Sequence, residues 1–237
     1  MLDQLTVGEK KSLDDFDASI SGRRIGIPAK KSIKETFLFS SKSHDFSKMN
    51  GELYWEEREL EYEFEITAAT PSELEQKKTA FSNWIMNVMN EKIHDPFIPA
   101  YHFVGTFEAM EYEDDESLEK TVATVTFKAY PFKIENELSA YNGTTPCGYN
   151  AVGVVVNPSD HRIAADFFTD LPLTLEMNDV ARYEFSGITP GGEELTEFKG
   201  AVILEPGENK WGVMMDLAED PNYTTANWAF RWHNEVM

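Results

Sequence analysis

Cysteine is nearly missing from this sequence, which has Cys147 alone among its 237 residues. A chain with one cysteine forms no disulfide with itself. Long apolar runs are missing too, since no stretch approaches the ~18 residues that a membrane helix needs. The N-terminal segment also lacks the apolar core of a signal peptide. We therefore expect a protein that has no signal peptide, is made in the cytoplasm and does not enter a membrane.

Basic residues are scarce. The chain has 21 Lys and Arg against 42 Asp and Glu, which gives a net charge of −21. The excess acid is spread out, with −10 in residues 1–135 and −11 in residues 136–237. Proteins that bind nucleic acid neutralise its phosphates with basic side chains, and anionic lipid surfaces attract the same groups. The composition therefore argues against specific nucleic-acid binding and against binding to a membrane surface.

Patterns typical of an active site are missing as well. None of the five histidines lies within four residues of another, and metal sites need closer ligand spacing. The sequence has no nucleophile elbow, phosphate-binding loop or dinucleotide fingerprint. Cys147 lies in a Pro/Gly loop without an activating base, and His102 is expected to be a strand histidine that points outward or has satisfied hydrogen bonds, rather than a metal ligand. We predict that the protein is not an enzyme and has no catalytic residue, cofactor or metal.

What the sequence does contain is apolar material for a core, at 41% of its residues. Alternating apolar and polar side chains predict strands over 57–67, 101–113 and 121–130. An acidic hairpin loop is expected between the last two of these strands. Residues 1–50 are expected to form a few short strands with long connections.

One long helix is predicted over residues 70–90. Thr70 suits the N-cap, Pro71 the first helical position and Glu73 the capping box. A single stripe of this helix carries Leu74, Phe81, Trp84, Ile85 and Val88. Burying these side chains would stabilise the helix on a sheet by ~1.5–3 kcal/mol each.

Residues 133–150 are rich in Asn, Gly, Thr and Pro and are expected to form a linker. The rest of the chain alternates short strand patterns with turns, which favours an antiparallel β-sandwich. The predicted fold class is mainly β. It combines an α+β N-terminal domain over residues 1–135, with one helix packed on its sheet, and an all-β sandwich over residues 136–237.

The stretch "ERELEYEFEIT" (57–67) poses a functional question. One face of the predicted strand carries four carboxylates, from Glu59, Glu61, Glu63 and Glu65. Glycosidase-type catalysis needs two carboxylates in contrasting environments, whereas these four are equivalent. We interpret the face as solvated, or as the lining of a surface to which a passing molecule should not adhere.

Three tryptophans of the second half, Trp211, Trp228 and Trp232, raise the question of sugar binding. Trp228 and Trp232 alternate with Phe230 onto one strand face, which is typical of a core. The alternative is an exposed sugar-binding platform, because β-sandwiches with exposed aromatic residues are common carbohydrate binders.

The order of several blocks resembles the distal tail protein family of siphophages, as found in phages and prophages of Gram-positive bacteria. The resemblance begins with "VGEKKSLDDFDASISGRRIGIPAKKS" (7–32) and "HDFSKMNGELYWEERELEYEFEI" (44–66). It continues through the helix with Trp84, "DPFIPAYHFVGTFEAME" and "TVTFKAYPF", and covers residues 1–135 best. The second half is similar to the galectin-like sandwich of that family at "LEPGENKWGV" and "WAFRWHNEV".

The resemblance implies a structural protein of the virion, at the tail tip. In that family the first domain forms a homo-hexameric ring, which joins the tail tube protein to the tail-associated baseplate or fibre protein. The second domain points outward and in some members helps to attach receptor-binding proteins. No catalytic or cofactor-binding residue is carried over, because the family has none.

The sugar motifs of true galectins are not reproduced here. Trp211 and Gly212 are followed by Val213, Met214 and Met215 rather than by the expected Glu and Arg, and "NPSDHR" (157–162) has its residue types in the wrong order. A galectin-type sugar site is therefore expected to be absent. A carbohydrate-binding module for host cell-surface glycans, based on the three tryptophans, is the alternative function.

A ring would give the glutamate face a role. If DNA passes through the ring, an acidic wall repels its phosphates whereas a basic wall would bind them. The face from Glu59 to Glu65 is thus lumenal or plainly solvated, because its alternation is strict and no stripe of lysines matches it. Ring closure also brings chains of net charge −21 together, so we expect salt or docking partners to favour assembly.

Overall fold

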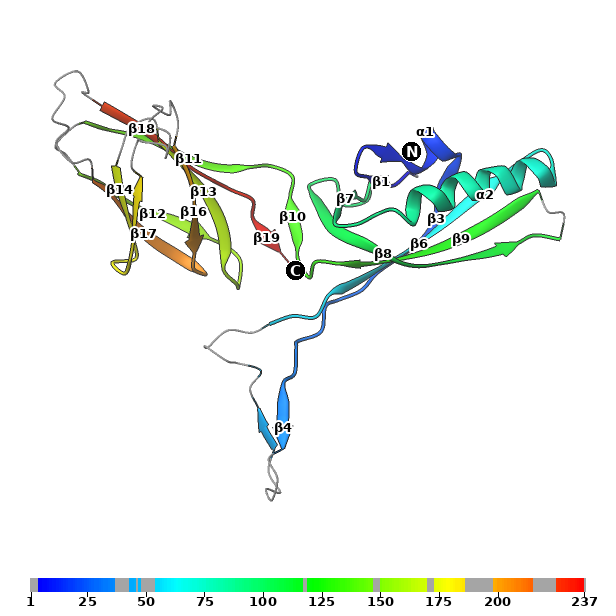
Figure 1. Cartoon of the computed structure of the whole chain (residues 1–237), viewed down its shortest axis with the longest axis horizontal. Coiled ribbons are helices and arrows are strands. Elements are labelled where there is room, and N and C mark those ends of the chain that lie inside the picture. Colours follow the sequence, from blue (N-terminus) through cyan, green and yellow to red (C-terminus); the bar gives the residue numbers. More distant parts are fainter. Residues whose placement is uncertain are drawn as a thin grey trace, which may run out of the picture. The chain divides into compact units, whose positions relative to one another are not determined.

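The computed structural model describes residues 4–36, 43–45, 47, 54–116, 119–146, 150–169, 173–185, 198–214 and 225–236. The chain divides into two compact units, of which the first ends at Asn136 and the second begins at Glu137. Within the described ranges, strands dominate and two segments are helical (Figure 1). The mainly β fold class expected from the sequence is confirmed.

The first unit is built on one antiparallel sheet. Its strands follow the order β2-β1-β7-β8-β9-β6-β3, and β10 pairs with β8. The strand bounds are β1 (Thr6–Val7), β2 (Lys10–Lys11), β3 (Ala18–Ile25), β6 (Arg58–Thr67), β7 (Glu91–His94), β8 (Tyr101–Asp114), β9 (Lys120–Ala129) and β10 (Lys133–Glu135). A separate hairpin pairs β4 (Lys34–Thr36) with β5 (Ser43–Asp45).

The long helix α2 (Pro71–Ile85) begins where the sequence predicts. The Thr70 side chain accepts a hydrogen bond from the Glu73 amide at 3.3 Å, while the Glu73 carboxylate accepts one from the Ala69 amide at 3.1 Å. The helix ends at Ile85, earlier than the predicted Asn90. Asn90 has a left-handed φ of 53°, so the chain turns there toward β7 instead of continuing the helix.

Helix α2 lies along one side of the sheet and buries the predicted stripe (Figure 1). The apolar side chains of β6, from Leu60, Tyr62, Phe64 and Ile66, are fully buried on that side. Four of the five predicted stripe residues lie in α2 and the fifth, Val88, lies just after its end, and all five belong to the same core. Each buried side chain of this size stabilises the fold by ~1.5–3 kcal/mol, so this contact accounts for much of the unit's stability.

A short helix, α1 (Ser12–Phe16), was not predicted from the sequence. It stacks the Phe16 ring on the Trp84 indole, with centroids 4.4 Å apart and planes within 3°. Five residues are too few to show helical periodicity, so this helix depends on tertiary contacts.

The second unit consists of two four-stranded antiparallel sheets, ordered β11-β18-β13-β16 and β12-β17-β14-β15. The bounds of the first are β11 (Ser139–Pro146), β13 (Ile163–Thr169), β16 (Phe198–Leu204) and β18 (Thr225–Trp232). Those of the second are β12 (Asn150–Asn157), β14 (Leu173–Met177), β15 (Ala181–Phe185) and β17 (Gly207–Met214). A final short strand is β19 (Glu235–Val236).

The linker predicted over 133–150 was wrong for most of its length, because β10 and β11 lie there. Strand β11 lacks large alternating apolar residues, and it is held by pairing with β18 from Ser139–Trp232 to Pro146–Thr225. Backbone pairing with β18 therefore stabilises β11, although its own sequence has no alternating apolar pattern that would predict a strand.

Large aromatic rings from both sheets form the core of the second unit. The Trp211 and Trp228 rings meet edge to face with centroids 4.6 Å apart, and Phe230 packs 5.8 Å from Trp211. Two glycines make room for the indoles. A Cβ at Gly143 would lie 2.2 Å from Trp228 Cζ2, and one at Gly153 would lie 2.5 Å from Trp211 Cζ2.

We therefore expect Gly143→Ala and Gly153→Ala to destabilise the second unit by ~1–3 kcal/mol each, because the added methyl overpacks a rigid indole. Gly212→Ala is the matched control, since its Cβ would meet Val152 Cγ1 at an ordinary 3.8 Å. Urea unfolding followed by tryptophan fluorescence measures the difference. Equal stability of the Gly143, Gly153 and Gly212 variants would contradict the packing argument.

A titratable contact ties β19 to the turn after β12. His161 Nε2 lies 2.7 Å from Glu235 Oε2, and His161 Nδ1 lies 3.1 Å from Asp160 Oδ1. Burial lowers the pKa of His161, but the hydrogen bonds to Glu235 and Asp160 outweigh burial and raise the pKa above its ordinary 6.5. The ion pair therefore forms most fully at mildly acidic pH.

Because the folded-state pKa of His161 is raised, its contribution to stability is complete below about pH 6.5 and is lost as the pH rises through the raised value. We expect the wild-type protein to lose stability from pH 6 to pH 8 relative to Glu235→Gln. Urea unfolding at both pH values provides the measurement. A Glu235→Gln variant with the same pH dependence as the wild type would show that this contact contributes nothing.

Candidate functional site: an open acidic sheet face

The outer face of β6 carries the four glutamates that the sequence places there. The strand alternates strictly, with its apolar side chains buried toward α2 and its carboxylates on the opposite side. Glu59 and Glu63 are exposed, while Glu61 and Glu65 are half-buried. In the described part of the first unit, α1 and α2 belong to the buried side, so this face is open.

Strand β8 extends the acidic surface. Glu63 of β6 and Glu111 of β8 both pair with Thr124 of β9, so their side chains share a face. Glu65 and Glu113 share Val122 in the same way. We call the set of outward glutamates the acidic face; it comprises Glu59, Glu61, Glu63, Glu65, Glu108, Glu111 and Glu113. The glutamates of β8 were not singled out from the sequence, because strand register decides which of them join the set.

Lysines stand at both ends of the acidic face but not in its middle. Lys128 Nζ lies 3.4 Å from both Glu59 and Glu108, and Lys120 Nζ lies 2.7 Å from Glu65. Desolvation lowers the pKa of Lys128, but hydrogen bonds to Glu108 and Glu59 outweigh it and raise that pKa. Exposed ion pairs of this kind contribute little to stability, because water and salt screen them. At the centre, Glu61 and Glu63 face Thr126 and Thr124 of β9. On the β3 side, Arg24 is opposite Glu61 and Gly22 is opposite Glu63, so Glu63 is the central carboxylate with no basic residue at either paired position.

The acidic face is not arranged for catalysis. Catalysis by a pair of carboxylates needs two contrasting environments, whereas no glutamate of this face is buried. Within the described ranges, no group of three or more His, Cys, Asp or Glu side chains could hold a metal ion. The arrangement suits electrostatic repulsion of anions.

A buried carboxylate does occur elsewhere in the first unit, at Asp95. Its oxygens accept hydrogen bonds from Arg23 at 2.5 Å, from the Tyr62 hydroxyl at 3.2 Å and from the Phe97 amide at 2.9 Å. Burial, followed by the negative charge of Asp95, raises the pKa of Tyr62. These contacts link β3, β6 and the segment after β7, so Asp95 is structural.

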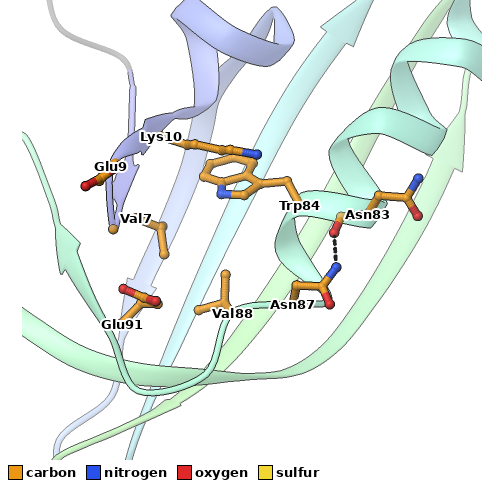
Figure 2. Close-up of a pocket in the computed structure, with 9 residues that line it drawn as sticks. Val7, Glu9, Lys10, Asn83, Trp84, Asn87, Val88 and Glu91 are labelled. Atoms are coloured by element: carbon orange, nitrogen blue, oxygen red, sulfur yellow. Dashed lines mark hydrogen bonds between the residues drawn. The ribbon is translucent and has the colours of Figure 1, made fainter.

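A pocket of about 430 Å³ lies between the β1–β2 turn and the end of α2. Figure 2 shows the side chains that line it. It is lined by Val7, Gly8, Glu9, Lys10, Asn83, Trp84, Asn87, Val88 and Glu91. Val7, Trp84 and Val88 supply its apolar surface, and Asn87 is fixed by donating to the Asn83 carbonyl at 2.6 Å. The lining contains no Ser, Cys or His, so it offers no paired nucleophile and base.

Two further residues were considered from the sequence, His102 and Cys147. His102 is buried, and its Nδ1 lies 2.8 Å from Asn136 Oδ1. Cys147 lies outside the described residues. Among the helices described, none is long and apolar enough to cross a membrane.

The three tryptophans considered for a sugar platform lie in the core. Trp211 and Trp228 are 5% exposed and Trp232 is 8% exposed. Trp228 Nε1 donates to Thr145 at 2.9 Å, and Trp232 Nε1 donates to Asn234 at 3.0 Å. A ring that stacks on a sugar needs an open face, so the platform interpretation does not fit this burial. The core interpretation does.

Comparisons with known proteins rest on structure alone. No family model matches the sequence, and no curated relative does either. Among solved structures, the chain is similar to the Dit protein (gp 19.1) of phage SPP1, described as a paradigm of the hub adsorption apparatus in phages that infect Gram-positive bacteria. The TM-score is 0.65 at 13% identity, over 99% of both chains.

A second similar structure is the activated baseplate of phage P2 with Ca. It matches at a TM-score of 0.41 and 10% identity, over 98% of both chains. The SPP1 match extends over both units, and its low identity shows a shared fold. The resemblance inferred from the sequence is thus confirmed for the fold.

Proposed function

We propose that the chain is a structural subunit of a siphophage tail tip, a distal tail protein. The observation that carries this proposal is the SPP1 Dit fold over 99% of both chains. The block order in residues 1–135 supports it independently, because that resemblance was drawn from sequence. The acidic face supports it as well, since it is suited to repulsion rather than to catalysis.

Under this proposal residues 1–135 form the ring and residues 136–237 form a galectin-like sandwich. The partners are other copies of the chain, in a homo-hexamer, together with the tail tube protein and the tail-associated baseplate or fibre protein. The second domain would contribute to holding a receptor-binding protein. The chain would be made in the cytoplasm of the bacterial host and reside in the virion.

The acidic face is proposed to line the ring channel. Among the described residues of its own unit the face is open, and Glu63 at its centre is paired with Thr124 and Gly22 rather than with a basic residue. DNA that passes such a wall meets repulsion instead of the ion pairs that would retain it. The plainly solvated outer surface is the competing placement.

Light scattering of the purified chain at about 0.3 M salt tests the ring. We expect a species of about six chain masses, each 27.0 kDa, and a ring with a central hole in negative-stain images. The net charge of −21 should weaken assembly at low ionic strength, since the same charges then repel over a longer range. Stronger association at the lowest salt would contradict the electrostatic argument.

Charge reversal tests the acidic face. We expect Glu61→Lys/Glu63→Lys to retain double-stranded DNA at low salt at least ~10-fold more strongly than the wild type, with binding that falls as salt rises. Glu176→Lys/Glu184→Lys, on the second unit, is the control because it changes net charge equally. Electrophoretic mobility shift of a DNA duplex provides the readout. Equal binding by both double variants would show that the acidic face has no special role.

A further inference from the structure

The longest charge-free stretch of this acidic chain is residues 138–159. It contains no Asp, Glu, Lys, Arg or His, although charged residues make up 27% of the whole sequence. Strands β11 and β12 both lie within it. The surface formed by this uncharged stretch therefore differs in its electrostatic properties from the rest of the chain.

These two strands are the edges of their sheets. Strand β11 begins the order β11-β18-β13-β16, and β12 begins the order β12-β17-β14-β15. They lie beside each other at one margin of the sandwich. The opposite edges, β15 and β16, carry charge at Arg182, Glu184 and Lys199. Charge therefore distinguishes the two margins of the same sandwich.

Strand β12 exposes a row of valines. Val152, Val154 and Val156 on its outer side are 78%, 45% and 52% exposed. Their neighbours on the inner side, such as Val155 at 3%, are buried in the core. Among the described residues, no buried cluster continues this row of valines, and their outer sides remain exposed.

The backbone of β12 is also available on one side. Pairing with β17 is continuous from Asn150–Met214 to Asn157–Gly207, without a bulge, and the other side has no strand partner among the described residues. Natural edge strands are usually protected by charge, proline or a bulge. Strand β12 has none of these from Asn150 to Asn157.

We propose that β12 pairs antiparallel with β12 of a second copy of this chain, which joins the two sheets into one continuous sheet. Antiparallel pairing centred on Val154 places Val154 opposite its own copy and Val152 opposite Val156. This register keeps outward residues opposite outward residues, as the strand period of two requires. Six valines then form one apolar strip across the two-fold axis.

A second copy is the occupant that the charges favour. Two chains of net charge −21 repel over most of their surfaces, whereas this edge has no charge to oppose its copy. The nearest acid on the sheet face is Glu208 of β17, opposite Val156. In the paired sheet the two β17 strands stand three strand spacings apart, ~14 Å, which exceeds the Debye length of ~8 Å at physiological salt.

The contact does not depend on the proposed ring, because it belongs to the second unit alone. An eight-residue strand buries less than the ~800 Å² per partner of a standard interface, so the pairing is weak and needs high concentration. Two single chains that pair in this way form a dimer of twice the mass, and a larger assembly with several β12 edges can associate further.

The test compares two glutamate substitutions in the full chain at matched exposure. Val154→Glu places two carboxylates opposite each other across the two-fold axis, which destabilises the strand pair. Ile203→Glu on β16 is the control, because Ile203 is also 45% exposed and points outward on the other sheet. Sedimentation equilibrium up to ~1 mM protein should show the wild-type and Ile203→Glu masses rising to twice that of Val154→Glu.

A second pair of variants tests the register. Val152→Lys/Val156→Glu places opposite charges across the axis twice and should keep the doubled mass, whereas Val152→Glu/Val156→Glu places like charges there and should halve it. Circular dichroism confirms that each variant is folded.

The proposal is overturned if the wild type never exceeds the mass of Val154→Glu, since another molecule's strand would then be the occupant. It is also overturned if Ile203→Glu halves the mass, or if the two double variants behave alike. A ring of equal mass in the wild type and in Val154→Glu refutes the edge pairing as a contact between assemblies and leaves the ring intact. A dimer of the wild type beside a single chain of Val154→Glu supports the edge pairing and refutes ring formation by the chain alone.

Discussion

The contact between Phe64 of β6 and Phe81 of α2, with ring centroids 5.2 Å apart, is the point on which the first unit depends. It fixes α2 against one side of the sheet and so decides which side of β6 is buried. Because side chains alternate along a strand, burying Phe64 and its apolar neighbours forces the glutamates onto the other side. The acidic face is a direct consequence of this packing.

The second unit uses a different device to fill its core. Gly143 and Gly153 let the indoles of Trp228 and Trp211 approach the backbone of β11 and β12. The same two edge strands then present small or uncharged residues outward. On the inner side of β11 and β12, large aromatic rings pack closely against glycine. On the outer side, the two strands carry no charged residue.

The elements that the sequence predicts well are those whose pattern is local. The alternation of β6 and the Thr70–Glu73 cap of α2 each lie within a few residues, and both are found where expected. Helix α1 and strand β11 depend on distant partners, Trp84 and β18, so their own residues carry little signal. The acidic face contains residues of both kinds. The glutamates from Glu59 to Glu65 can be predicted from local alternation, whereas Glu111 and Glu113 belong to the face because of the register between β8 and β9.

Charge is distributed so that different surfaces suit different contacts. The acidic face is repelled by a copy of itself, since its seven glutamates outnumber the basic residues beside them, Arg24, Lys120 and Lys128. The edge of β12 can approach its copy, because valine meets valine there and the nearest glutamates remain separated by two strands. A chain of net charge −21 therefore restricts self-contact to its uncharged or charge-balanced surfaces. Repulsion between the acidic surfaces of two copies disfavours other contacts, so it contributes to the specificity of self-contact together with attraction at the uncharged surfaces.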